Sequence, residues 1–491
     1  MRSEWVVFYI HSRLVNGYIT RRGIMKLTNS AKYAYGFGAL GKDLVCGVVG
    51  VYIMFYFTDV IGLNPAFVGT LFLIARIWDT VNDPMMGMLV DNTRTKWGKF
   101  RPWILIGTLI NAVVLFFLFK KPDLTGAPLY AYFSVMYILW GMTYTIMDIP
   151  YWSMIPSLTQ DKEEREKISV IPRVFAAIGN LCVATFGLSM VHQLGKGNQA
   201  NGFEYLALGI SIIFIITSVV MCLKVKEPST KVAKTNTSET DRVTLKQTFK
   251  IIGQNGQLKV FIVIVLCMNL MLSFLGGMAL YYFKYVTQNE GMFQIYNGCA
   301  GFAEIAGLLM FPILVKRMGR KHVFRLGCVS PIVGLLVLLV CGFIAPQNTL
   351  LVAIGAFLAR AGGGLIIASS TVMLADVVDY SEYKFGTRNE SIIFSCQTLL
   401  VKSASALSGW LIGVGLAAFG YVANAQQTMT TMMGMRGLMF VLPAIFIALC
   451  FIVYKKYYKI TGDYHEEIIK ELEARQQATK QGLEVTNLSY E

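Results

Sequence analysis

The spacing of apolar residues is the feature that most restricts how this chain can fold. Twelve apolar runs follow one another, each about as long as the roughly 20 residues that a membrane-spanning helix needs. Charged residues make up only 15% of the chain, against about 25% in soluble globular proteins, so the polar surface of a soluble protein is missing. We therefore expect an all-α membrane protein with twelve transmembrane helices, at residues 36–58, 65–90, 102–120, 128–156, 172–194, 204–223, 260–286, 291–315, 323–345, 349–380, 389–421 and 433–454.

Basic residues gather in alternate connections between these runs. Connections after even-numbered runs are rich in Lys and Arg, whereas those after odd-numbered runs hold few. Because Lys and Arg accumulate in cytoplasmic loops, we expect the even connections and both termini to be cytoplasmic. The net charge of +15 is then explained by the cytoplasmic loops and does not indicate binding to nucleic acid. The expected partner is the lipid bilayer. The odd connections carry only Lys120, Lys121, Lys196, Lys284 and Arg436.

A polar stretch at 225–258 divides the runs into two groups of six. Two six-helix halves joined by a long loop are typical of the major facilitator fold. We interpret residues 1–24 as an extension from an upstream start, with Met25 as the true start, because they contain no run long enough to span. The expected order is the extension 1–24, an N-terminal half 25–224, a central cytoplasmic loop 225–258, a C-terminal half 259–456 and a cytoplasmic tail 457–491, with an amphipathic helix at 464–473.

Two acids in the second run predict a cation site. Asp79 and Asp83 are spaced i, i+4, which places both carboxylates on one face of a helix. Two such charges repel in a medium of low dielectric, so we expect one of them to bind a proton or a cation to lie between them. Asn82 and Thr145 add oxygen atoms, which suit a small hard cation. The alternative is static pairing of these acids with Arg76 or Lys402.

A second polar set predicts recognition of a neutral, polyhydroxylated substrate. Asp43, Asp148 and Arg173 lie inside apolar runs, where ionisable groups are costly and are functional candidates. Carboxylates accept hydrogen bonds from hydroxyls, a guanidinium donates them, and aromatic faces cover the apolar side of a sugar ring. The same aromatic residues also occur as ordinary packing or interface residues. The neighbours in sequence are Lys42, Trp140, Tyr144 and Trp152.

The connection after the second run predicts a gating contact. Asp91 stands at its start and Arg94 follows, within Gly87–Pro102. Asp91 could pair with an arginine across the cytoplasmic face and hold one conformation until the two halves rock. The simpler alternative is a positively charged loop that only sets the topology, and both can hold together.

Several stretches of this sequence resemble the glycoside–pentoside–hexuronide:cation symporter family, and the bacterial melibiose permeases in particular. The similarity runs from about Lys26 to Asp463. It is carried by Tyr35-Gly-Phe-Gly-Ala-Leu-Gly-Lys42-Asp43, Trp78-Asp79-Thr-Val-Asn82-Asp83-Pro84, Trp97-Gly-Lys-Phe-Arg-Pro-Trp-Ile-Leu-Ile-Gly-Thr108, Trp140-Gly-Met-Thr-Tyr144-Thr145-Ile-Met-Asp148-Ile-Pro150 and Ala375-Asp376-Val-Val-Asp379-Tyr380-Ser-Glu-Tyr-Lys384.

The resemblance implies roles for individual positions. It implies a sodium site at Asp79, Asn82, Asp83 and Thr145, with Lys402 close by. We expect coupling or gating roles for Lys402 and, in the charged cytoplasmic connections, for Asp91, Arg94 and Arg388. The resemblance also implies sugar-binding residues, which are Asp43, Asp148, Trp152 and Arg173 for the galactosyl unit, with Lys42, Tyr144, Gln397 and Thr398 beside them. Two departures remove aromatic surface from the pocket, because Ile367 replaces a tryptophan and Gly50 a tyrosine of the melibiose permeases. The sugar beyond the galactosyl unit is therefore open.

These observations together predict a symporter in the bacterial inner membrane. We expect it to import a galactoside-type oligosaccharide such as melibiose with Na⁺, Li⁺ or H⁺ by alternating access. Apart from this co-transported ion no cofactor is expected. The cytoplasmic loops could receive a regulatory protein, and the oligomeric state is open. Glu304 and Arg360 have no assigned role.

Some other functions are consistent with parts of this sequence. Another glycoside, a pentoside or a hexuronide fits the same family, and a lysolipid would need a large apolar side opening. A sugar sensor would carry an added signalling domain. An enzyme is not expected, because no set of nucleophile, base and orienting residue is visible.

The nine cysteines form no CxxC pair and are interpreted as small core residues rather than disulfides or metal ligands.

Overall fold

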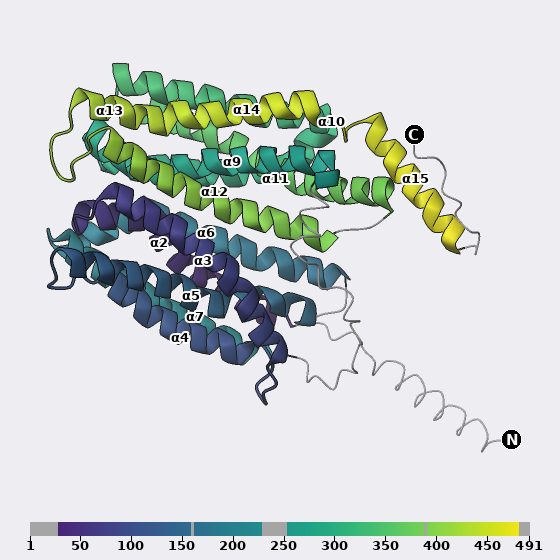
Figure 1. Ribbon diagram of the computed structural model, residues 1–491, viewed down its shortest axis with the longest axis horizontal. Helices are drawn as coiled ribbons and strands as arrows, with labels where there is room; N and C mark the ends of the chain where they lie inside the picture. The colour runs from purple at the N-terminus through teal and green to yellow at the C-terminus, as the bar shows by residue number, and fades with distance from the viewer. Residues whose placement is uncertain (1–27, 159–161, 228–252, 387–389, 481–491) are drawn as a thin grey trace, which may run out of the picture. The chain divides into compact units, whose positions relative to one another are not determined.

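The computed structural model describes residues 28–158, 162–227, 253–386 and 390–480, and within these ranges helices are the regular elements (Figure 1). The residues assigned to an N-terminal extension and most of the central loop lie outside the described ranges. The helices are α2 (Asn29–Phe55), η1 (Tyr56–Val60), α3 (Pro65–Asn92), α4 (Arg101–Leu118), α5 (Ala127–Leu158), α6 (Lys162–Gly195), α7 (Gln199–Lys224), α9 (Gly256–Tyr281), η3 (Tyr282–Val286), α10 (Gly291–Ile344), α11 (Thr349–Phe385), α12 (Glu390–Ala418), α13 (Met429–Arg436), η4 (Gly437–Val441), α14 (Leu442–Tyr457) and α15 (Asp463–Lys480).

Each predicted apolar run coincides with one of these helices or a directly continuous set of them, to within three residues at its ends. The runs 102–120, 323–345 and 389–421 extend two, one and three residues past the ends of α4, α10 and α12. The 54-residue α10 contains two runs, because the chain bends inside it at Gly319. Gly319 has φ 80° and ψ 157°, a backbone conformation that favours glycine. The bend lies within the basic turn 316–322 that separates the two runs in the sequence.

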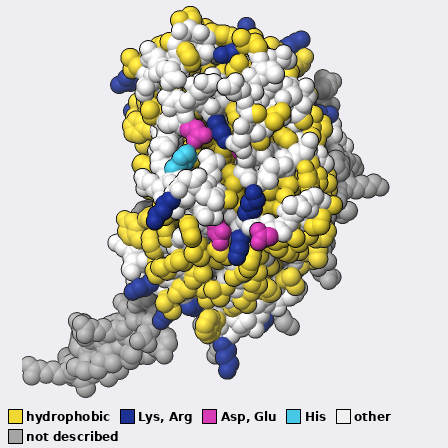
Figure 2. All heavy atoms as spheres, turned by 90° about the vertical axis from the view of Figure 1, so that its left-hand side faces the viewer, with side chains coloured by type: hydrophobic (Ala, Val, Ile, Leu, Met, Phe, Trp, Pro, Cys, Tyr) yellow, Lys and Arg dark blue, Asp and Glu magenta, His cyan; other side chains and the backbone are white. Residues whose placement is uncertain are grey.

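The helices have the length and surface of membrane-spanning segments. Nine helical segments of the described chain are long and apolar enough to cross a membrane. Large apolar side chains are exposed on them, such as Leu309 at 70% and Leu223 at 67%. Figure 2 shows many hydrophobic side chains on one face, with charged side chains near its middle and at places along its edge. Contiguous exposed apolar surface of this kind needs a lipid surrounding.

The chain divides into two compact units, which are described separately. The first unit comprises residues 1–47, 79–182 and 203–234. In it α4 packs along α5, and Gly107 allows the close approach, since a Cβ there would lie 2.7 Å from the backbone nitrogen of Met147. The start of α4 is held by the Glu227 carboxylate, which accepts hydrogen bonds from the backbone N–H groups of Lys99, Phe100 and Arg101 at 2.6, 3.0 and 2.8 Å. A carboxylate is favourable there because helix N-termini carry partial positive charge.

The second unit comprises residues 48–78, 183–202 and 235–491. It therefore contains the ends of several helices of the first six runs together with all described helices of the last six. Helix α10 packs along α11, and α9 packs against both α12 and α14. Helices α3 and α12 approach closely at Gly69 and Gly413, since a Cβ on Gly413 would meet the carbonyl oxygen of Pro65.

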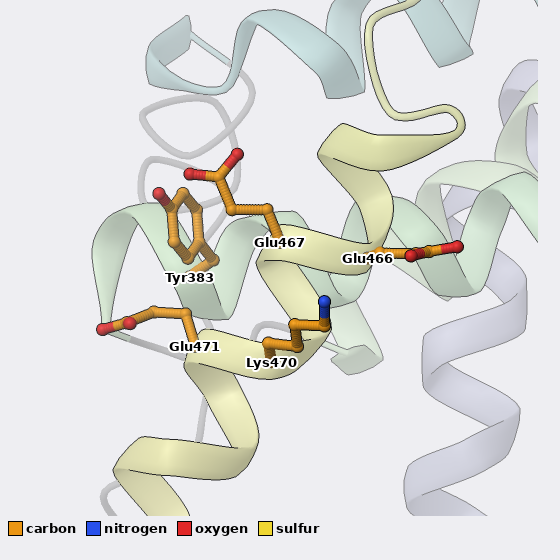
Figure 3. A pocket seen from close by; sticks show the side chains of 5 residues that line it. All are labelled: Tyr383, Glu466, Glu467, Lys470 and Glu471. Atoms are coloured by element: carbon orange, nitrogen blue, oxygen red, sulfur yellow. The ribbon is translucent and has the colours of Figure 1, made fainter.

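The predicted amphipathic helix of the tail is confirmed as α15. Its apolar side chain Ile468 is buried, and its Arg475 donates a hydrogen bond of 3.1 Å to the carbonyl oxygen of Tyr383 at the end of α11. His465 lies 3.2 Å from Asp376 of α11. Figure 3 shows a groove between Tyr383 and the acidic face of α15, and its walls hold none of the predicted site residues.

Candidate functional site

Lys42 forms the centre of a polar cluster in the first unit. Its ammonium lies 3.0 Å from Asp43 and 2.9 Å from Asp148 of α5, and it donates a hydrogen bond of 3.3 Å to the Tyr144 hydroxyl. The Lys42 side chain is only 4% exposed, whereas Asp148 is 29% exposed. Asp148 also accepts a hydrogen bond of 3.1 Å from the Trp152 indole. The structure thus brings together five of the residues predicted to bind sugar.

The walls of this cluster are aromatic. The Lys42 ammonium lies 5.1 to 5.7 Å from the ring centroids of Trp152, Tyr151 and Tyr144. Trp140 stacks on Tyr144 with ring centroids 5.5 Å apart. A sugar ring has an apolar face, which aromatic rings can cover, and hydroxyls, which can donate hydrogen bonds to carboxylates. This cluster holds both kinds of group.

Two tyrosines hold α2 against α5 beside the cluster. Tyr35 and Tyr151 stack with ring centroids 4.5 Å apart, and each hydroxyl donates to the other residue's carbonyl oxygen. Helix α6 approaches α2 closely, because a Cβ on Gly179 would lie 3.0 Å from the carbonyl oxygen of Leu40. These backbone approaches fix the positions from which the polar side chains project.

Helix α6 contributes one expected and one unexpected residue. Arg173 is exposed, and within the described part of the chain it makes no hydrogen bond or ion pair. Asn180, on the same helix, instead donates a hydrogen bond of 3.3 Å to Asp43. Sequence reasoning missed Asn180, although an amide within an apolar run is a recognisable signal.

The predicted cation residues lie on α3 and α5 of the same unit. Thr145 donates a hydrogen bond of 3.1 Å to Asp83. Asp79 is buried one turn earlier, and a Cβ on Gly141 of α5 would lie 3.4 Å from its carboxylate oxygen. The amide nitrogen of Asn82 is buried and, among the described residues, has no hydrogen-bond partner. The structure therefore brings the Thr145 hydroxyl to Asp83 and places Asp79 beside Gly141 of the same helix, with the buried Asn82 amide one residue before Asp83.

A proline inside α3 removes one backbone hydrogen-bond donor between the two acids and the end of the helix. Pro84 lies inside the helix, and proline has no N–H to donate to the carbonyl four residues earlier. The carbonyl oxygen of Thr80, between the two acids, therefore has no helical donor. Sequence reasoning did not use this residue, although the pair Asp83-Pro84 could have signalled it.

The remaining predicted residues are spread over the chain. On α12 of the second unit Gln397 and Lys402 are half-buried and Thr398 is exposed. Ile367 is half-buried on α11, and Gly50 is exposed, with open space where a side chain would stand. Arg94 is exposed and donates to its neighbouring Thr93 carbonyl at 3.4 Å. Arg388 and the side chain of Asp91 lie outside the described part.

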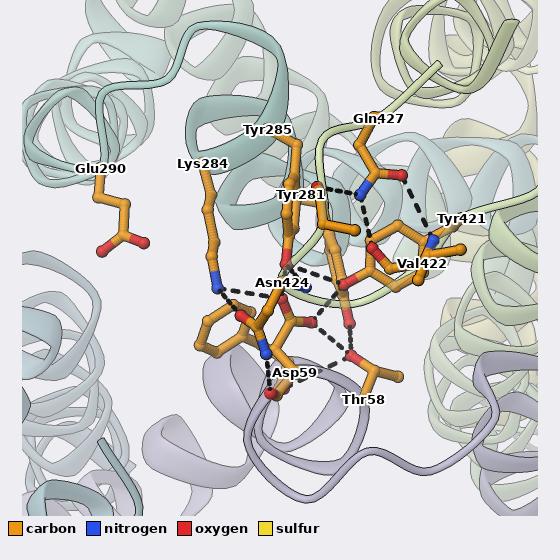
Figure 4. A network of polar contacts seen from close by, with 12 residues as sticks. Thr58, Asp59, Tyr281, Lys284, Tyr285, Glu290, Tyr421, Val422, Asn424 and Gln427 are labelled. Carbon is orange, nitrogen blue, oxygen red and sulfur yellow. Dashed lines mark hydrogen bonds and ion pairs between the residues drawn. The ribbon is translucent and has the colours of Figure 1, made fainter. Parts of the chain in front are cut away.

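A third polar cluster, in the second unit, was not predicted (Figure 4). The Asp59 carboxylate at the end of η1 is fully buried and lies 3.1 Å from the Lys284 ammonium. It also accepts hydrogen bonds from Tyr285, from Tyr421 at 2.6 Å and from Thr58 at 2.8 Å. We call this group the Asp59 cluster; its signal in the sequence is a single acid near the end of the first apolar run.

The Asp59 cluster joins three connections that follow odd-numbered runs. The Asn424 side chain, in the connection between α12 and α13, donates to the Asp59 carbonyl oxygen at 2.6 Å and accepts from Lys284 at 3.0 Å. Burial and the negative charge of Asp59 raise the pKa of Tyr421 far above its usual range, so its hydroxyl stays a donor. The cluster thus ties the end of the first helix to the seventh and to a late loop.

Comparison with known proteins shows similarity to sugar transporters. The model of the family described as MFS/sugar transport protein matches residues 34–462. The isoprimeverose transporter of Lactiplantibacillus pentosus is 30% identical over 81% of this chain and 82% of its own length. The lactose permease of Lactobacillus delbrueckii subsp. bulgaricus is 27% identical over 92% of this chain and 73% of its own length.

A solved structure shows the same fold at low sequence identity. It is the crystal structure of a bacterial homologue of the human lysosomal transporter Spinster, in an inward-facing and unoccupied conformation. The TM-score is 0.64 at 12% identity, and the match covers 88% of this chain and 97% of that one. At this identity the likeness concerns the fold alone.

Proposed function

The chain belongs to the family of MFS/sugar transport proteins, and we propose that it imports a galactoside-type oligosaccharide, such as melibiose, together with Na⁺ by alternating access. Its family confirms the predicted resemblance to sugar–cation symporters and the all-α major facilitator fold. The relatives are transporters, so the prediction that the chain is not an enzyme is also confirmed.

One observation carries the proposal for the substrate and the ion. Helix α5 contributes to both polar sets of the first unit, because Thr145 bonds to Asp83 while Asp148, three residues later, pairs with Lys42. Residues three apart on a helix share a face. The two polar sets are therefore separated by about one turn of α5, and a charge bound at one set acts electrostatically on the other. Such proximity is what coupling of an ion to a sugar requires.

The cation set has the chemistry of an alkali-metal site. Asp79, Asp83 and Thr145 supply oxygen atoms, and the Thr80 carbonyl is left without its helical donor by Pro84. Turning the Asn82 amide by 180° would present its oxygen in place of the unpartnered nitrogen. We infer that a bound Na⁺ or Li⁺, or a proton on one acid, relieves the repulsion between the carboxylates.

The sugar set has the chemistry of a neutral pyranoside site. Lys42, Asp43 and Asp148 carry both donors and acceptors, and Trp152 and Tyr144 supply rings beside them. Its formal charge is negative, with one ammonium against two carboxylates. That charge disfavours a hexuronide and favours an uncharged glycoside.

The proposed orientation follows from the loop charges. The basic even-numbered connections and both termini would face the cytoplasm of a bacterial cell, and the Asp59 cluster would then lie on the outer side. Alternating access would open and close the two sides in turn, with Lys402, Asp91, Arg94 and Arg388 as coupling or gating residues. A regulatory protein at the cytoplasmic connections is a further proposed partner.

The test is uptake of radiolabelled sugars by cells, with Na⁺, Li⁺ or neither present. The panel contains melibiose, lactose, isoprimeverose, a β-glucoside and a glucuronide, so the alternatives within the family are measured together. We expect a galactoside to be taken up and Na⁺ to stimulate its uptake. Uptake of another class alone would replace the galactoside, and uptake indifferent to all three conditions would reject cation coupling.

Two substitutions separate the proposed sites. Asp83→Cys is expected to abolish stimulation by Na⁺ while sugar binding is partly retained. Asp148→Cys is expected to remove sugar binding. Full sodium-dependent uptake by the Asp83 variant would refute the assignment of the cation site.

A further inference from the structure

One oxygen atom of the Asp43 carboxylate is an acceptor that the protein itself leaves open. This atom, Oδ2, is buried, yet it accepts no hydrogen bond in the described part of the chain. The Lys42 ammonium lies 3.0 Å from the carboxylate at the same atom, so a donor is close by but lacks the alignment of a hydrogen bond. An unsatisfied buried acceptor costs free energy. Another contact must therefore impose this orientation on the carboxylate.

That contact comes from Asn180 of α6. Its amide nitrogen donates a hydrogen bond of 3.3 Å to Asp43 Oδ1 and one of 3.2 Å to the carbonyl oxygen of Ala176. An asparagine amide has two N–H donors, and both partners are acceptors, so the amide oxygen cannot take the place of the nitrogen. Asn180 thus holds one oxygen of Asp43, and the other oxygen faces the Lys42 ammonium.

The backbones of α2 and α6 are in direct contact beside this hydrogen bond. Gly179 precedes Asn180, and a Cβ on Gly179 would lie 3.0 Å from the carbonyl oxygen of Leu40 and 3.4 Å from the backbone nitrogen of Leu44. Leu40 and Leu44 flank Asp43 along α2, and all of these residues belong to the first unit. A side chain placed by so close a helix contact is well suited to fix the orientation of its partner.

Without Asn180 the carboxylate would have a simpler way to satisfy its open oxygen. A turn of the Asp43 side chain would align Oδ2 with the Lys42 ammonium and complete a charge-assisted hydrogen bond, which is a strong one. Lys42 would then use its donors on two carboxylates, because it also lies 2.9 Å from Asp148. A closed pair of this kind would leave neither the acceptor nor the ammonium open to a sugar hydroxyl.

We infer that Asn180 is a positioning residue of the sugar set, which keeps Asp43 Oδ2 open as the acceptor for one hydroxyl of the bound glycosyl unit. This inference rests on the proposed function, because it deepens how that site recognises its substrate. A fixed acceptor also discriminates between epimers. A sugar whose hydroxyl points the other way leaves the buried acceptor unpaired, and that penalty is the basis of strong discrimination.

The first experiment removes the hydrogen bonds of Asn180 and keeps the approximate size of its side chain. Binding of methyl galactoside and of its C4 epimer, methyl glucoside, is measured by calorimetry on the purified full-length protein in lipid nanodiscs with saturating Na⁺. We expect Asn180→Leu to bind the epimer that the wild type prefers about tenfold more weakly and to discriminate less between the two. Asn201→Leu, at an exposed position of α7, is the matched control and should change neither affinity.

The second experiment tests positioning through pH. Asn180→Asp keeps the shape of the side chain but places a second carboxylate against Asp43. The two repel when both are ionised, whereas one shared proton restores a donor where the amide N–H stood. Relative to the wild type at the same pH, we expect its sugar affinity to rise as the pH falls from about 8 to about 5.5, while Asn180→Leu shows no such gain. The ionisable groups of α2 and α5 beside Asp43 are the same in all these proteins: Lys42, Tyr144, Asp148 and Tyr151.

The outcomes separate this inference from the proposed function. If Asn180→Leu keeps the affinity and the epimer ratio of the wild type, or if Asn180→Asp gains nothing at low pH, Asn180 only joins two helices and the inference fails alone. If the wild type binds methyl glucoside only, the galactoside is replaced, and the variants are compared on methyl glucoside instead. If it binds neither epimer, the proposed function fails and takes the inference with it. Na⁺ binding without sugar shows that the variants are folded, and Asn180→Asp decides if the leucine variant does not fold.

Discussion

Lys42 is the residue on which the proposed sugar set depends most directly. One ammonium lies between the carboxylates of Asp43 and Asp148, so the group keeps a net negative charge after the ion pairs form. Neutral hydroxyls can add donors to those carboxylates without bringing in another charge. Three aromatic rings also lie within 5.7 Å of the ammonium, and cation–π attraction compensates part of the lost hydration.

Replacing Lys42 by alanine should therefore disable the sugar set. The two acids would face each other without a cation, and breaking a buried pair in this way typically costs about 3–5 kcal/mol. We expect sugar affinity to fall at least about tenfold, or about 1.4 kcal/mol, and the thermal midpoint to fall as well. Equilibrium binding of the transported sugar checks this, with the exposed Lys120→Ala as control. Wild-type affinity in the Lys42 variant would contradict the assignment.

Replacing Thr145 by valine tests the cation set without changing the shape of the side chain. The hydroxyl that donates to Asp83 would be lost, while the contacts of Lys42 stay intact. We expect the Na⁺ concentration for half-maximal stimulation to rise about tenfold and sugar binding without Na⁺ to stay unchanged. Thr70→Val is the control, since the Thr70 hydroxyl donates a hydrogen bond within its own helix, to the carbonyl oxygen of Ala66. Equal Na⁺ dependence in both variants would exclude a role for the Thr145 hydroxyl.

At this scale the sequence predicts residue types better than partners. Periodicity places Asp79 and Asp83 on one face, and Thr145 does reach Asp83. Lys42 was expected only as a neighbour, yet it pairs with both acids, while Arg173 is exposed and Asn180 holds Asp43. Helix rotation and packing at small residues such as Gly179 decide which side chain faces inward, and a single sequence does not contain that information.

At the scale of elements, the first and seventh spans end in the same way. Helix α2 continues into η1 with Tyr-Phe-Thr-Asp-Val, and α9 continues into η3 with Tyr-Phe-Lys-Tyr-Val. Each π-helical turn closes with a hydrogen bond to its first tyrosine carbonyl, from Ile61 at 3.0 Å and from Thr287 at 3.2 Å. Apolar periodicity predicts the span but not this widened turn, which carries Asp59 at its fourth residue in η1 and Lys284 at its third residue in η3.

Neutralising Asp59 should loosen the connection between these two helix ends. Asp59→Asn leaves the Lys284 ammonium, 14% exposed, without its counter-charge, so we expect the thermal midpoint to fall by several degrees. The double variant Asp59→Asn, Lys284→Met should recover part of the loss, because no bare charge remains. Thermal unfolding of the purified protein checks both, with exposed Asp123→Asn as control. A single variant as stable as the wild type would show that the cluster does not hold these ends.

At the scale of the whole molecule, the distribution of charge and the energy source are linked. In the proposed mechanism, the polar groups of the first unit bind a cation of unit charge and, beside it, a neutral sugar. A membrane potential of 100 mV supplies about 2.3 kcal/mol per charge moved, which corresponds to a sugar gradient of roughly 50-fold. The basic connections set the orientation of the protein in the membrane. The membrane potential therefore acts in one fixed direction on a cation bound at the proposed cation set.

Coupling between ion and sugar makes a prediction that concerns both polar sets at once. If Na⁺ raises the affinity for sugar by some factor, the sugar must raise the affinity for Na⁺ by the same factor, since both describe one free-energy cycle. Calorimetric titration of sugar with and without Na⁺, and of Na⁺ with and without sugar, measures the two factors independently. We expect equal factors above about fivefold in the wild type and factors near one in Asp83→Cys. Equal factors that persist in the Asp83 variant would place the ion elsewhere, because Asp83 is the acid that Thr145 of α5 contacts.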